Sequence, residues 1–191
     1  MTNFRPVRAK GPAGARLRRS HPIVVRVAPG KRSEGLIALA NGVRRAALGR
    51  SGVRALKREG DGATPLGRFP IRLVLYRADR VHPPRVPFPL RAIRGDDGWS
   101  EDPDNRNYNR LVKLSPRSTA DRLRRADHLY DVIVVLGHND RPRVKGRGSA
   151  IFVHRARDGL APTAGCIALS RRDLSALLAE LRPDSQIVVM R

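Results

Sequence analysis

The sequence contains few of the residues that several common classes of protein require. One of its 191 residues is cysteine, so neither an internal disulfide nor a cysteine-rich zinc site can form. It has four Phe, three Tyr and one Trp, so the core must be built mainly from Val, Leu, Ile and Ala. There is no apolar run of about 18 residues, which excludes an apolar membrane-spanning helix. The composition, 40% hydrophobic and 29% charged, is that of a folded globular domain.

Negative charge is also scarce. Lys and Arg total 39 against 17 acidic residues, which gives a formal net charge of +22, and only five of the basic residues are lysines. Such a field attracts polyanions such as nucleic acid, an anionic membrane or an acidic cell-wall polymer. The basic residues are spread along the chain rather than gathered in one element. Genome composition and solubility therefore explain the excess as well as a binding role does.

The first 20 residues carry six basic side chains and no acidic one, interrupted by Gly and Pro. A secretory signal would continue with about 7–15 apolar residues and a small-residue cleavage site. Here the next apolar run is three residues long and is broken by Arg26. We therefore predict a basic, flexible tail over residues 1–21 without a recognisable signal peptide, followed by one domain over residues 22–191.

The pattern of this domain is mainly β. Apolar runs separated by turn residues predict strands. The expected strands cover residues 23–27, 35–40, 42–48, 71–76, 131–137, 149–154 and 187–190. Four prolines exclude a central strand or a helix over 81–89, and 102–109 has loop composition. One helix is expected over 170–181, because Ser170 and Asp173 resemble a capping box and four leucines follow at helical spacing.

Cys166 and His154 are the candidates for chemistry. His154 ends an apolar strand, and Cys166 follows 12 residues later, after the tight turn 161–165. Gly165 lets a carbonyl substrate approach the backbone, and N–H groups of a turn that leads into a helix can face an oxyanion. A neighbouring imidazole would raise the thiolate fraction by ion pairing. These residues are the minimum set for acyl transfer, although a lone cysteine is more often a small buried apolar side chain than a nucleophile.

Two motifs favour the catalytic interpretation. His154 together with residues 163–167, TAGCI, resembles the active-site signature of the YkuD-type L,D-transpeptidases, in which a His and a spacer precede Ser/Thr-x-Gly-Cys-Ile/Val. Residues 60–69, GDGATPLGRF, are similar to that family's second motif, Gly-Asp-x-x-Thr-Pro-x-Gly-x-Phe/Tyr. The resemblance covers residues 22–190 and is to a compact, divergent branch of the family.

This resemblance implies a β-sandwich catalytic domain and a covalent mechanism. Cys166 would attack the carbonyl on the L-centre of the third residue of a peptidoglycan stem tetrapeptide, and the terminal D-alanine would leave. An amine of a neighbouring stem, a free D-amino acid or water would then resolve the thioester. His154 would act as base and then as acid, held by a backbone carbonyl such as that of Arg155. N–H groups around Gly165 and Cys166 would bind the oxyanion, and a carbapenem would form an adduct with the thiol. No metal or organic cofactor is implied.

Two departures from the family pattern concern substrate placement. Ala164 stands where the family usually has His, and Ala168 stands where it usually has Arg. The arginines that could replace the second of these are Arg155, Arg157 and Arg171. The residues expected to contact substrate are Thr163, Ala164, Arg155 and Asn139.

His138 is included among the candidate catalytic residues. It ends the strand expected beside that of His154, so the two imidazoles could lie close together. Two other interpretations stay open, a loop anchor bonded to Asn139 or Asp140, and a metal ligand with His154 and Cys166. We expect no metal, because a structural zinc site normally has four ligands.

We therefore predict a cysteine-dependent peptidyltransferase, an L,D-transpeptidase that forms cross-links or exchanges the terminal D-amino acid. One alternative is an endopeptidase or carboxypeptidase that transfers the same acyl group to water. The other is a nucleic-acid-binding protein, opposed by the scarcity of aromatics for base stacking and by the lack of a helix-turn-helix or zinc-finger pattern. The predicted activity would place the protein in the periplasm or cell envelope. Its partners would be stem peptides, and we expect a monomer.

Overall fold

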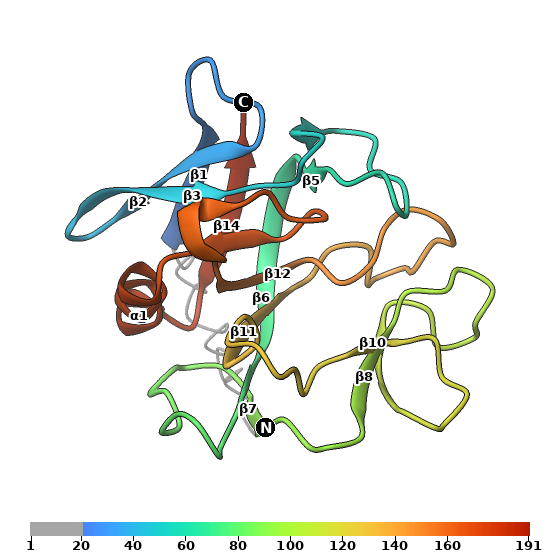
Figure 1. Ribbon diagram of the computed structural model, residues 1–191. Helices are drawn as coiled ribbons and strands as arrows, with labels where there is room; N and C mark the ends of the chain where they lie inside the picture. Colours follow the sequence, from blue (N-terminus) through green and yellow to red (C-terminus); the bar gives the residue numbers. More distant parts are fainter. Residues whose placement is uncertain (1–20) are drawn as a thin grey trace, which may run out of the picture.

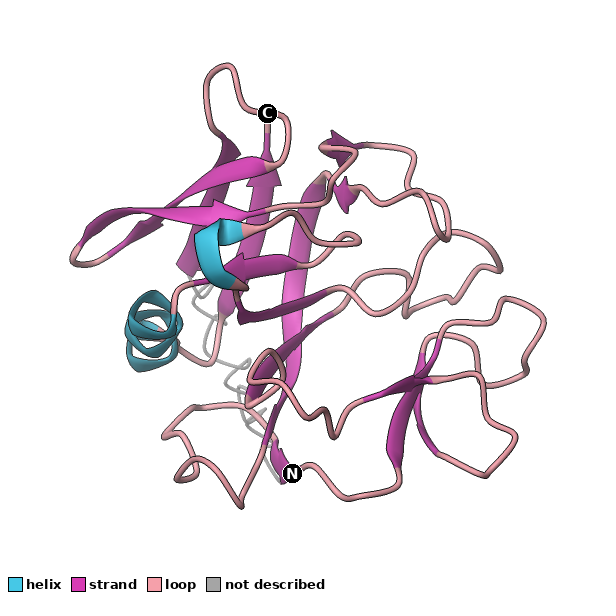
Figure 2. Ribbon diagram, viewed as in Figure 1, coloured by secondary structure: helices cyan, strands magenta, loops and turns pink. Residues whose placement is uncertain are grey.

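Strands supply most of the regular structure in residues 21–191, the part of the chain that the computed structural model describes (Figures 1 and 2). The strands are β1 (His21–Val27), β2 (Glu34–Leu39), β3 (Gly42–Ala47), β4 (Val53–Arg54), β5 (Thr64–Pro65), β6 (Gly67–Tyr76), β7 (Leu90–Ala92), β8 (Asp97–Ser100), β9 (Arg110–Lys113), β10 (Asp121–Arg122), β11 (Val132–Leu136), β12 (Phe152–Arg155), β13 (Ile167–Leu169) and β14 (Ser185–Met190). The helical segments in this part are the 3₁₀ turn η1 (Asp158–Leu160) and the α-helix α1 (Arg171–Glu180).

One large sheet organises these strands. Its order is β11-β12-β13-β3-β2-β1-β14-β6-β7, and β11 also pairs with β6, so the sheet bends back on itself. Side chains from both halves of the folded sheet meet in the main core. β8, β9 and β10 form a separate three-stranded sheet, and β4 pairs with β5. The prediction of a mainly β sandwich with one α-helix is confirmed.

Strand β11 separates two cores. Its sequence is VIVVL, and all five residues are buried. Val134 is in the main core, whereas Ile133 and Val135 belong to a second cluster that contains Trp99 and Phe152. The rings of Trp99 and Phe152 meet edge to face with centroids 5.1 Å apart. Since successive strand residues face opposite sides of a sheet, the continuous apolar run indicates this double burial, as predicted.

The helix α1 also follows the predicted pattern. Ser170 is its N-cap and accepts a hydrogen bond from the Asp173 N–H at 3.1 Å. Leu174, Leu177 and Leu178 are buried against the main core. We expected the turn before Cys166 to lead directly into this helix, but it does not. Residues Ile-Ala-Leu after the cysteine form β13, which pairs with β12 and β3 and separates the turn from α1.

Several strands lie in segments without a strand pattern. β4, β5 and β7 to β10 have at most four residues each, too few to show periodicity. Residues 81–89 form a loop, as predicted, and β7 follows it at the edge of the large sheet. The strand expected over 149–154 begins only at Phe152, because Ala150 has a φ of +50° and interrupts the extended backbone.

The expected basic tail lies outside the described residues, except that His21 is already part of β1. In residues 21–191, no helix has the length and apolar character needed to cross a membrane.

Candidate active site

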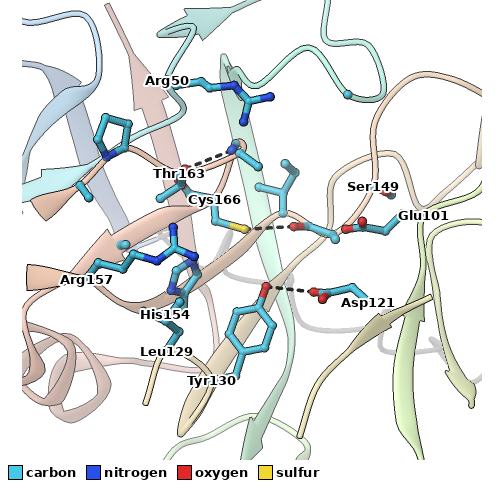
Figure 3. Close-up of a pocket in the computed structure, with 18 of the residues that line it drawn as sticks. Arg50, Glu101, Asp121, Leu129, Tyr130, Ser149, His154, Arg157, Thr163 and Cys166 are labelled. Atoms are coloured by element: carbon cyan, nitrogen blue, oxygen red, sulfur yellow. Dashed lines mark hydrogen bonds between the residues drawn. The ribbon is translucent and has the colours of Figure 1, made fainter. Parts of the chain in front are cut away.

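A pocket of about 340 Å³ contains both Cys166 and His154 (Figure 3). Cys166 comes from the turn before β13, and His154 comes from β12, which pairs with β13 in parallel. The pairing of these two short strands therefore brings the thiol and the imidazole to the same pocket. A volume of this size accommodates a small peptide fragment.

The thiol of Cys166 is neutral in this structure. Its Sγ donates a hydrogen bond to the Ala150 carbonyl at 3.1 Å, and the side chain packs against the second core. Burial raises the pKa of the Cys166 thiol to about 12, which the backbone N–H of Phe152 only partly offsets. A thiol with this pKa is almost entirely protonated at neutral pH.

His154 is held in one tautomer. It is 6% exposed, and its Nδ1 donates to the Arg155 carbonyl at 2.7 Å, as the family resemblance implied. Because a carbonyl can only accept, the proton is on Nδ1, and Nε2 is the unprotonated nitrogen. Burial lowers the pKa of His154 to about 4. The imidazole is therefore neutral as well, and the ion pair with Cys166 that we expected is not the resting form.

The turn that carries Cys166 is stabilised by Thr163. Its Oγ1 accepts a hydrogen bond from the Gly165 N–H at 3.0 Å and donates to the Cys166 carbonyl at 2.7 Å. Gly165 has a φ of +145°, and a Cβ there would lie 2.8 Å from the Ala63 carbonyl oxygen. The Gly165 N–H is thus engaged within the turn. Two N–H groups were expected to bind an oxyanion. The hydrogen bond to Thr163 engages that of Gly165 but not that of Cys166.

The segment before β4 joins the two sequence motifs through backbone contacts. The Gly49 N–H donates to the Thr64 Oγ1 at 2.8 Å, which ties Gly49 to the GDGATPLGRF motif. The Thr163 N–H donates to the Leu48 carbonyl, and the Arg50 N–H donates to the Thr163 carbonyl, each at 2.9 Å. A Cβ at Gly49 would lie 2.4 Å from a backbone oxygen of the motif. The turn that carries Cys166 is therefore packed on this motif.

Asp61 organises the motif itself. It accepts hydrogen bonds from the Lys57 ammonium at 2.6 Å and from the backbone N–H groups of Arg58 and Ala63, each at 2.9 Å. Although burial acts to raise it, these hydrogen bonds hold the pKa of Asp61 below its ordinary value. Lys57 is buried and lines the pocket, so its ion pair with Asp61 stabilises the loop that borders the pocket.

The structure does not bring His138 or Asn139 to this pocket. β11 and β12 are antiparallel with Ile133 opposite His154, so His138 follows the far end of β11, about 16 Å away at the usual rise per residue. His138 Nε2 donates to the Arg147 carbonyl at 3.0 Å. The Asn139 amide donates to two carbonyls of the same loop, each at 2.9 Å. His138 therefore anchors a loop, but through the Arg147 carbonyl rather than through Asn139 or Asp140 as that interpretation expected, and the expected proximity of the two imidazoles is wrong.

Some of the other predicted residues line the pocket and some do not. Thr163, Ala164, Gly165 and Ala168 line the pocket. Three arginines were considered as replacements for the family's usual Arg. Of these, Arg157 lines the pocket. Arg155 and Arg171 do not line it, and Arg155 contributes its carbonyl to His154 instead. In residues 21–191, no group of three His, Cys, Asp or Glu side chains is arranged to hold a metal ion.

The pocket also has an acidic side that the sequence does not indicate. It is formed by Glu59, Glu101 and Asp121, and Tyr130 lies beside it and donates a hydrogen bond to Asp121 at 3.1 Å. Burial and the nearby Asp121 and Glu59 carboxylates raise the pKa of Glu101 to about 7, and burial also raises the pKa of Asp121. These residues come from loops and from β10, and no motif or spacing in the sequence links them.

The fold and the site together define a β-sandwich with a pocket that contains a cysteine thiol and a histidine held in one tautomer. A family model described as the YkuD L,D-transpeptidase catalytic domain matches residues 24–189, nearly the whole chain. The chain therefore belongs to the YkuD family. Searches of curated proteins and of solved structures found no match.

Proposed function

We propose that this protein is a peptidoglycan L,D-transpeptidase whose nucleophile is Cys166. The observation that carries the proposal is that this thiol and the anchored imidazole of His154 occupy one peptide-sized pocket in a domain of this family. The acyl donor is a stem tetrapeptide. Cys166 attacks the carbonyl on the L-centre of its third residue, and the terminal D-alanine leaves.

Acylation starts from a neutral thiol and a neutral imidazole. His154 Nε2 accepts the thiol proton as Sγ attacks, because Nδ1 keeps its proton in the bond to the Arg155 carbonyl. The N–H of Cys166 is the proposed donor to the oxyanion, since that of Gly165 is engaged by Thr163. As the C–N bond breaks, His154 gives its proton to the departing amine. The products are the thioester and free D-alanine.

An amine from a second stem or a free D-amino acid then resolves the thioester. Arg50 and Arg157 line the pocket together with the catalytic turn and are proposed to bind carboxylates of the donor peptide. Because the substrate is part of the cell wall, the proposed site of action is the cell envelope.

The test is incubation of the purified protein with a stem tetrapeptide and with isolated sacculi, followed by mass spectrometry of the products. We expect D-alanine release, a protein mass increased by the acyl group, and new cross-linked or D-amino-acid-exchanged muropeptides. Products shortened by one D-alanine without any amine transfer would indicate the hydrolase instead. Absence of both the acyl-enzyme and D-alanine release would overturn the proposal.

The matched control is Cys166→Ser. Because a hydroxyl is far less acidic than a thiol, D-alanine release should fall by several orders of magnitude. The mass increase caused by a carbapenem should disappear with it. A carbapenem adduct that persists on the variant would show that another residue is the nucleophile.

A further inference from the structure

Resting on the proposed function, we propose that the acidic side of the pocket binds the ammonium group of the acyl acceptor, with Glu101, Asp121 and the hydroxyl of Ser149 as its acceptors. The donor and the acceptor then have separate subsites on either side of Cys166. The class of acceptor is a primary amine that is positively charged before it reacts.

The first observation is that carboxylates gather on one side of the pocket. Figure 3 shows Arg157 and His154 on one side of Cys166, and Glu101 and Asp121 on the other. The chain as a whole has 39 basic residues and only 17 acidic ones. Because basic residues outnumber acidic ones, a group of carboxylates on one side of the pocket is not expected from composition alone.

The cations of the pocket compensate these carboxylates only in part. The Lys57 ammonium is bound by Asp61 and by the Arg58 carbonyl, at 2.6 and 2.7 Å. Arg125 is directed to Asp127 at 2.6 Å and reaches Asp121 only at 4.0 Å. Glu101 forms no ion pair with the residues that the structure describes. Its pKa of about 7, raised by burial and by the neighbouring carboxylates, reflects this lack of a cation.

Ser149 provides an independent observation. It is 6% exposed and lines the same pocket, and Figure 3 places it next to Glu101. Its buried Oγ has no partner with hydrogen-bond geometry among the described residues, although the Tyr108 hydroxyl is near enough to interact with it. An unpartnered buried hydroxyl is costly to the fold, so it is expected to be satisfied by a ligand. A primary ammonium has three N–H donors, and this side of the pocket offers it two carboxylates and a hydroxyl.

The same carboxylates prepare the amine for reaction. An ammonium must lose a proton before it can attack, and the Glu101 carboxylate accepts that proton. The neutral amine nitrogen then attacks the thioester carbonyl, the new C–N bond forms, and the C–S bond breaks. A second amine proton passes to His154 Nε2 and from there to Sγ, which restores the thiol. Glu101 releases its proton to solvent, so the protons balance.

The experiment measures the two half-reactions separately. The donor is a stem tetrapeptide, and the acceptor is a stem tripeptide with a free side-chain amine. In Glu101→Gln, KM for the acceptor should rise about tenfold or more, because a charged hydrogen bond is replaced by a neutral one. Products should shift from transfer toward hydrolysis, and the effect on acceptor KM should far exceed that on D-alanine release. Glu101→Asp should recover part of the loss.

Two further variants sharpen the result. Ser149→Ala should raise acceptor KM by a smaller factor. Asp104→Asn makes the corresponding carboxylate-to-amide change on the same loop as Glu101 but outside the pocket, with a side chain that is 93% exposed, and should change neither half-reaction. Unchanged acceptor KM and unchanged partition between transfer and hydrolysis in Glu101→Gln would overturn the inference.

A binding measurement separates this inference from the proposed function. The tripeptide is titrated by calorimetry into Cys166→Ala and into Cys166→Ala with Glu101→Gln, and the same tripeptide with its amine acetylated serves as the comparison. We expect the second substitution to weaken binding of the free amine by about tenfold, and the acetylated peptide to bind weakly to both. Equal binding of the free and acetylated peptides would reject the amine subsite even if the enzyme is active. An amine preference without any acylation by the parent protein would reject only the proposed reaction.

Discussion

The two sides of the pocket are built in different ways. The turn that carries Cys166 is packed on the GDGATPLGRF motif, with a glycine at each close approach, and the hydroxyls of Thr163 and Thr64 accept hydrogen bonds from backbone N–H groups. The acidic side consists of single side chains from loops and from β10, and Glu101 has no partner among the described residues. The turn of Cys166 is thus positioned by backbone packing, whereas the acidic side of the pocket is formed by individual side chains.

The largest effect that tests this comparison is expected from the histidines. His154→Ala should lower the rate of acylation by about 10²- to 10⁴-fold, because it removes the proposed base from the pocket of Cys166. His138→Ala should have a much smaller effect on that rate, since its ring bonds a loop carbonyl outside the pocket. The measurement is kcat/KM on a stem tetrapeptide. Equal or reversed losses would mean that the pocket has been assigned to the wrong histidine.

The backbone support of the catalytic turn is tested by Gly49→Ala. The added Cβ would lie 2.4 Å from the Gly62 carbonyl oxygen and 2.7 Å from the Thr64 nitrogen, and backbone cannot easily move aside. We expect a loss of about 2–3 kcal/mol in the free energy of unfolding, measured by chemical denaturation. Gly95→Ala is the matched control, because a Cβ there meets nothing within 4 Å. Similar stability of the two variants would contradict the tight packing described here.

The protonation state of the thiol predicts a pH profile for alkylation. Burial opposes the charged thiolate and raises the pKa of Cys166 to about 12, so a rise in pH increases the small thiolate fraction. The rate of reaction with iodoacetamide should increase about tenfold per pH unit from pH 7 to 10 without levelling, whereas an ordinary thiol levels once pH exceeds its pKa of about 8.5. The unfolded protein supplies that comparison. A plateau below pH 8 in the folded protein would indicate an ion pair with His154.

The smallest expected effect concerns the surface charge. If the arginine excess serves binding to an anionic sacculus, association should weaken as salt is added, while turnover of a small tetrapeptide should change little. Deletion of residues 1–20 removes six basic side chains and should lower sacculus affinity without loss of tetrapeptide turnover. Sedimentation of sacculi at two salt concentrations measures this. Salt-independent association would assign the arginines to solubility, and tight duplex DNA binding with an unreactive thiol would favour the nucleic-acid alternative.

Strand β11 illustrates how far the sequence could predict the fold. Its continuous apolar run indicates burial on both faces, and the two cores confirm this. The short strands β8 to β10 could not be predicted, because segments of two to four residues with charged members show no periodicity. They form through pairing with one another, and Trp99 of β8 packs on Phe152 of β12.

The family and the turn that carries Cys166 could be predicted from the sequence alone, because they depend on short motifs whose residues interact with near neighbours, as Thr163 does with Gly165 and Cys166. The side chains that surround this turn could not be predicted, because they meet only when distant segments fold together. The antiparallel pairing of β11 with β12 puts His138 at the far end of its strand, and strand direction is not encoded in an apolar run. The acidic side of the pocket likewise exists only once the loops are packed, because Glu101 and Asp121 are 20 positions apart and share no pattern.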